Sequence, residues 1–101
     1  MNTTEHLLTC LAEEAAELSQ ACAKALRFGL DDQYPVGDKS NQDKIAKEFN
    51  DVLAIMDMLQ NGGWFTTKLN TKVVSNRLIA EKISRVRNWM EYSRARGMLR
   101  E

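Results

Sequence analysis

Four acidic residues stand in two short patterns on consecutive segments of the chain. Glu14 and Glu17 belong to an EExxE run, and Glu48 and Asp51 form an ExxD pattern. On helical wheels Glu14 falls at the edge of an apolar stripe, and Glu48 falls inside an apolar arc. These positions face a core rather than water. The spacing therefore predicts carboxylates that converge between two helices.

Such carboxylates need a cation nearby. Burying an ionised carboxylate costs several kcal/mol unless it is compensated, and like charges at i, i+3 repel on a helix. We expect no Lys or Arg on the same inner stripes at matching height, so the economical partner is a divalent metal. All-oxygen ligands favour Mg²⁺, with Mn²⁺ as a substitute. The single histidine, His6, and the absence of a Glu-x-x-His motif disfavour zinc and di-iron.

The elements that must position these acids are helices. Residues 4–27 contain no Gly or Pro and are rich in strong helix formers, with Thr3 or Thr4 as N-cap and Gly29 as the stop. Further helices are predicted over 43–61 and 75–95. The intervening residues 30–42 are expected to form a loop, whereas 64–74 stay unassigned. No alternation typical of strands persists, so the predicted fold class is all-α.

Each predicted helix carries one apolar stripe at helical spacing. Three such helices in 101 residues make a thin core, which a second copy of the chain would complete. We therefore expect a helical bundle in a homodimer or homotetramer. The predicted stripes are Leu7, Leu11, Ala15, Leu18, Cys22 and Leu26; Ile45, Phe49, Val52, Leu53, Met56 and Leu59; and Leu78, Ile79, Ile83, Val86, Trp89 and Met90.

Composition excludes several other classes of protein. Lys plus Arg and Asp plus Glu both number 14, so the formal net charge is zero, which argues against a protein that coats nucleic acid. No apolar run is long enough to cross a membrane, and no secretory signal is visible. Cys10 and Cys22 lie twelve residues apart in one helix, about 18 Å, beyond disulfide reach. Reduced thiols and a cytoplasmic location are expected.

The two acidic patterns resemble those of the MazG-like all-α nucleoside triphosphate pyrophosphohydrolases. The runs Glu13–Gly29 and Glu48–Leu59 are similar to short, single-domain, phage-type members, as is Tyr92-Ser93-Arg94 with Gly97. The resemblance covers most of the chain apart from 30–42 and 62–74, and it implies one MazG-like domain over 1–101. The gap between the two acidic patterns is a little longer than is usual in the family.

The resemblance implies an enzyme that hydrolyses ribo- or deoxyribonucleoside triphosphates to the monophosphate and pyrophosphate. A metal-activated water would attack the α-phosphorus. The implied metal ligands are Glu14, Glu17, Glu48 and Asp51, with Glu13 outside them. Glu17 and Glu48 are the candidate general bases.

Three further side chains are expected to bind substrate. Lys24 lies two turns beyond Glu17, about 10 Å along the helix, where it could contact a phosphate further down the polyphosphate chain. Arg27 is placed for a similar contact or to cap its helix, and Asn50 for a nucleobase or supporting contact. Trp64 and Phe65 could stack on a base, although aromatic residues there favour a core role.

Other functions fit the same residues. The enzyme could be a narrower member, acting on dUTP, dCTP or phosphoribosyl-ATP. It could also be a catalytically silent module that binds a nucleotide or a protein, or a plain helical dimerisation module.

Overall fold

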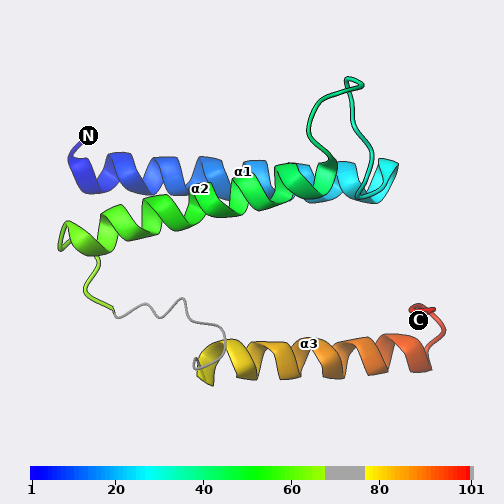
Figure 1. Cartoon of the computed structure of the whole chain (residues 1–101). Helices are drawn as coiled ribbons and strands as arrows, with labels where there is room; N and C mark the ends of the chain where they lie inside the picture. The colour runs from blue at the N-terminus through cyan, green and yellow to red at the C-terminus, as the bar shows by residue number, and fades with distance from the viewer. Residues whose placement is uncertain (68–76, 101) are drawn as a thin grey trace. The chain divides into compact units, whose positions relative to one another are not determined.

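Three helices make up the secondary structure of the computed structural model, which describes residues 1–67 and 77–100 (Figure 1). They are α1 (Thr3–Phe28), α2 (Asn41–Asn61) and α3 (Arg77–Ala95). No strand occurs in the described residues, which confirms the all-α prediction. The third helix is predicted to start at residue 75, which lies outside the described residues. Residues 68–74 of the unassigned stretch 64–74 lie outside them too.

The chain divides into two compact units. Met1–Thr67 holds α1 and α2, and Lys68–Glu101 holds α3. Within the second unit, the rings of Trp89 and Tyr92 meet edge to face with centroids 5.6 Å apart. Whether 1–101 acts as one domain stays a prediction. None of the described helices is long and apolar enough to traverse a bilayer.

Helices α1 and α2 pack against each other along their length and run in opposite directions (Figure 1). The less exposed side chains of both helices recur at alternating spacings of three and four, the pattern of a coiled-coil seam. At the end of the pair where α1 begins and α2 ends, Leu7 and Leu59 are buried. The seam positions are Leu7, Leu11, Glu14, Leu18, Ala21 and Ala25 on α1, and Asn41, Ile45, Glu48, Val52, Ile55 and Leu59 on α2.

This seam differs from the stripes predicted from the wheels. Ala15, Cys22 and Leu26 are exposed on α1, and Phe49 is half exposed on α2. An i, i+4 stripe drifts around a helix, whereas a straight partner helix is contacted at a mean spacing of about 3.5 residues. The correction brings Glu14 from the edge of the apolar face into the seam itself.

Side-chain caps fix where the two helices begin. Asn2 accepts a hydrogen bond from the backbone N–H of Glu5 at 2.8 Å, so the N-cap of α1 is Asn2 and not Thr3 or Thr4. Ser40 accepts one from Asp43 at 3.2 Å, and α2 therefore starts two residues before the predicted position 43. Gly29 ends α1 with a φ of 97°, a conformation that favours glycine.

Candidate metal centre and the adjoining groove

Three of the four predicted metal ligands come together across the seam. Glu14 and Glu17 project from α1 and Glu48 from α2, and one carboxylate oxygen of each lies within 4.8 Å of the other two. Spacing of this order allows one cation to contact all three groups. The seam register produces the cluster, because Glu14 and Glu48 both occupy positions that face the partner helix.

The cluster leaves buried oxygen atoms without partners. Oε2 of Glu14 and Oε2 of Glu48 are buried and accept no hydrogen bond within the described residues. Burial raises the pKa of Glu14, and the negative charges of Glu17 and Asp51, together with contact with Glu48, raise it further. A buried acceptor without a partner is costly. A divalent cation would satisfy both oxygens, so the donor set fits an oxygen-ligated Mg²⁺ or Mn²⁺.

Asp51, the fourth predicted ligand, is engaged differently. Its Oδ2 lies 2.8 Å from Nζ of Lys47, which is also 3.6 Å from Oε1 of Glu48. Both carboxylates raise the pKa of Lys47, Asp51 the more. No Lys or Arg occupies a seam position, as expected, but the acids still gain a basic partner, which the sequence interpretation did not foresee. Lys47 leaves the helix outside the seam, but its long flexible stem carries the ammonium back to the acids.

A groove leads away from the glutamates along the two helices. This groove, called here the lysine groove, has a volume of about 290 Å³. The acids at one end are Glu17 and Glu48, and the ammonium groups toward the other are Lys24 and Lys44. Within the described residues Lys24 forms no ion pair. The full lining is Glu17, Gln20, Ala21, Lys24, Asn41, Lys44 and Glu48.

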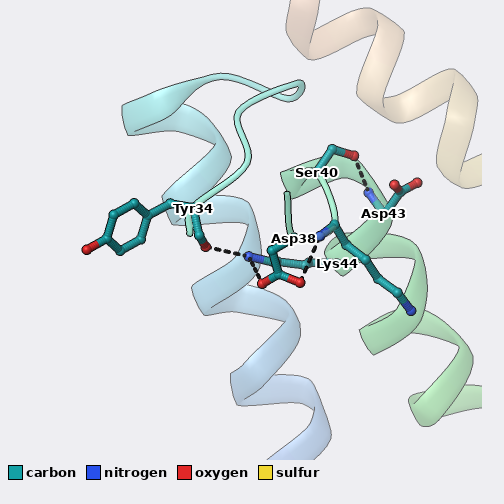
Figure 2. A network of polar contacts seen from close by, with 6 residues as sticks. Tyr34, Asp38, Ser40, Asp43 and Lys44 are labelled. Atoms are coloured by element: carbon teal, nitrogen blue, oxygen red, sulfur yellow. Dashed lines mark hydrogen bonds and ion pairs between the residues drawn. The ribbon is translucent and has the colours of Figure 1, made fainter. Parts of the chain in front are cut away.

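Lys44 is held by the loop that joins the helices (Figure 2). Its Nζ donates to the backbone carbonyl of Tyr34 at 3.1 Å and lies 3.4 Å from Oδ2 of Asp38. The backbone N–H of Lys39 and, after it, the charge of Lys44 lower the pKa of Asp38. The ammonium is thus tethered at the side of the groove.

The other predicted site residues lie away from this groove. The guanidinium of Arg27 stacks over the ring of Phe28, 5.4 Å from its centroid. Asn50 lines a separate hollow of about 400 Å³ with Lys47 and Asp51. Neither residue lines the lysine groove.

Trp64 and Phe65 follow the end of α2, which lies beside the start of α1 (Figure 1). That end of the helix pair is the one remote from the lysines of the groove. The ring of Trp64 covers Gly62 so closely that an added Cβ would lie 1.9 Å from it. Trp64 packs on this backbone but stays 48% exposed, so it does not take the core role that the sequence favours.

The structure adds groove residues that the sequence interpretation missed. Lys44 precedes Glu48 by one helical turn, so its spacing was a usable signal. Gln20 follows Glu17 by three residues, so it too lies one helical turn from an acid. Asn41 could not be found in this way, because it was assigned to the loop rather than to the first turn of α2.

Comparisons with known proteins add no relative. No family model, curated protein or solved structure matches this chain. The case for a function therefore comes from the site and from the sequence patterns.

Proposed function

We propose that this chain is a Mg²⁺-dependent nucleoside triphosphate pyrophosphohydrolase, which converts a ribo- or deoxyribonucleoside triphosphate to the monophosphate and pyrophosphate. Mn²⁺ would serve as a substitute. The proposal agrees with the resemblance of the two acidic patterns to the MazG-like enzymes.

The observation that carries the proposal is the lysine groove. Glutamates that suit a divalent cation lie at one end of it, and two lysines that suit phosphate oxygens line the rest. Lys24 forms no ion pair with any described residue, whereas Lys44 is paired with Asp38, so Lys24 is the cation of the groove that needs an anion. A metal-bound polyphosphate supplies both the cation and the anion that the groove lacks.

Each group in the groove then has a role. Glu14, Glu17 and Glu48 would hold the ion, and Asp51 could join them when Lys47 swings away. Lys24 and Lys44 would bind and orient phosphate oxygens, which places the reacting phosphorus for attack. When bound, the ion neutralises phosphate charge and activates water.

Glu17 is the side chain best placed to take the proton from the attacking water. It is the exposed acid of the three and lines the groove, and no Lys or Arg of the described residues pairs with it. Glu48 is the alternative base, and its Oε1 lies 3.6 Å from Nζ of Lys47. No covalent intermediate is required.

Pyrophosphate release from a panel of ribo- and deoxyribonucleoside triphosphates tests the proposal. We expect release with Mg²⁺ or Mn²⁺ and none with chelator. Glu48→Gln keeps the shape of the side chain but removes its charge, so activity should fall at least about 100-fold, since even lost outer-shell partners of a metal cost 10–100-fold.

Glu13→Gln is the matched control, because Glu13 is exposed and lies outside the cluster. It should retain wild-type activity, and thermal melts of both variants would establish that they are folded. Full activity in Glu48→Gln would refute the metal assignment. Nucleotide binding by the folded wild type without any product would favour the silent binding module instead.

A further inference from the structure

A second cavity adjoins the lysine groove at the end where α1 stops and α2 starts. This cavity, called here the aromatic pocket, has a volume of about 400 Å³. Lys24, Asn41 and Lys44 line both cavities, so the two lie side by side. The aromatic pocket adds Phe28, Asp32 and Tyr34 to these shared residues.

The loop that carries Asp32 and Tyr34 is fastened to the start of α2. The Asn41 side chain donates to the carbonyl of Gly29 at 2.8 Å, and its backbone N–H donates to the carbonyl of Asp32 at 3.0 Å. Lys44 holds the backbone of Tyr34, whose ring points away from that polar network (Figure 2). The pocket is therefore preformed at its base.

The lining suits a flat heteroaromatic ring. Phe28 is 62% exposed and Tyr34 is 81% exposed, so the Tyr34 ring and the face of Phe28 opposite the Arg27 guanidinium are accessible for stacking. The Asp32 side chain has no hydrogen bond or ion pair with any described residue. A carboxylate is acceptor-only, and it can receive two parallel N–H donors.

We infer that the aromatic pocket binds the nucleobase of the substrate and that Asp32 selects bases by their N–H donors. The inference rests on the proposed function. Guanine offers two adjacent donors on one edge, so it should fit best. Adenine and cytosine offer one amino group beside an acceptor nitrogen. In thymine and uracil, carbonyl oxygens flank the one N–H and would face the carboxylate.

The order of groups along α1 sets the direction of the bound nucleotide. Eleven residues separate Glu17 from Phe28, about 16 Å along the helix, and Lys24 stands between them. With the base at Phe28, Lys24 lies on the base side of the metal ligands, so the α-phosphate would lie beside Glu14, Glu17 and Glu48, where the water attacks. This direction reverses the sequence-based expectation that Lys24 contacts a distant phosphate.

The ratio of kcat/KM for GTP to that for UTP, and for dGTP to dTTP, tests the inference. Wild type should prefer the guanine nucleotides. Asp32→Asn replaces one acceptor by a donor, so the preference should fall about tenfold or more, the scale of one bidentate base contact. Asp57→Asn makes the same change on α2 outside the pocket and should leave the ratio unchanged.

Stacking is tested at Tyr34. Tyr34→Ala should raise KM for every nucleotide about fivefold or more. Tyr34→Phe keeps the ring, so its KM should stay at the wild-type value. An unchanged base ratio in Asp32→Asn, or wild-type KM in Tyr34→Ala, would overturn the inference while leaving hydrolysis intact.

Binding of GMP and UMP by calorimetry separates the two proposals. It needs no turnover, so it reports on the pocket even if no pyrophosphate is released. Tighter binding of GMP that is lost in Asp32→Asn would support the pocket alone. Equal and Asp32-independent binding would reject it.

Discussion

Glu14 is a carboxylate at a seam position between Leu11 and Leu18. Burial is the first cause that raises the pKa of this carboxyl, followed by the charges of Glu17 and Asp51. A raised pKa in the folded state means that folding disfavours the ionised form. The resulting loss of folding stability is fully present above the pKa of Glu14 in the folded state. It disappears below the ordinary glutamate pKa of about 4.3.

Glu14→Gln should therefore melt at a higher temperature than wild type at neutral pH without metal. The difference should shrink as the pH falls through the raised pKa, since wild type then becomes neutral at this position too. Thermal melts in chelator across a pH series measure it. Excess Mg²⁺ should raise the melting temperature of wild type more than that of the variant.

Glu13→Gln serves as the control in these melts and should show no such pH dependence. A Glu14→Gln variant that melts below wild type at pH 7 would mean that the carboxylate stabilises the metal-free fold.

The acids themselves could be predicted from sequence because their spacing and their place among apolar residues are visible there. The structure brings Glu14, Glu17 and Glu48 together as expected. The role of Lys47 could not be predicted from a helical wheel. A wheel records where a side chain leaves the helix and not how far a flexible stem carries its charge.

At the scale of the element, the number and type of helices followed from the helix-forming composition and the Gly and Pro breaks. The seam did not, because two faces of α1 are rich in small and apolar residues. Only the partner helix selects between them. The sequence predicts a loop after Gly29, but the course of this loop depends on hydrogen bonds between residues that are distant in sequence. One of them runs from the backbone N–H of Gln42 to the carbonyl of Leu30, at 2.9 Å.

Asn41 joins the end of α1 to the start of α2. It is 5% exposed, and its side chain donates to the carbonyl of Gly29. Asn41→Ala removes the donor and leaves a part-buried carbonyl without it, so the free energy of unfolding should fall by about 1–3 kcal/mol. Urea unfolding followed by circular dichroism measures the change.

Gln42→Ala is the matched control. It also removes a side-chain bond to the loop, to Asp31 at 2.6 Å, but both groups are exposed. Its effect should be within about 0.5 kcal/mol. Equal losses in the two variants would contradict the special role of Asn41.

At the scale of the whole molecule, each of the two units, taken by itself, leaves many apolar side chains uncovered. Among the described residues only Leu7 and Leu59 are buried hydrophobics, and α3 contains no buried residue. On that helix alone, Leu78 is 66% exposed and Trp89 is 68% exposed. The apolar face of α3 therefore needs a cover from outside that helix.

We expect the chain to self-associate. Light scattering after size exclusion should give a mass that is two or four times 11.5 kDa. The melting temperature should rise with protein concentration, because association stabilises the folded form by mass action. A particle of 11.5 kDa with a concentration-independent melting temperature would refute this expectation.

The position of Lys47 has a consequence for how the centre would be loaded. Its ammonium bridges Asp51 and Glu48 while staying 58% exposed, so it can leave without any movement of the backbone. Glu48 and Asp51 thus have a tethered counterion of their own. Binding of a divalent ion would then replace the Lys47 ammonium at these carboxylates. A divalent ion would gain more from the three carboxylates than a sodium or potassium ion, because the interaction energy grows with the charge of the ion.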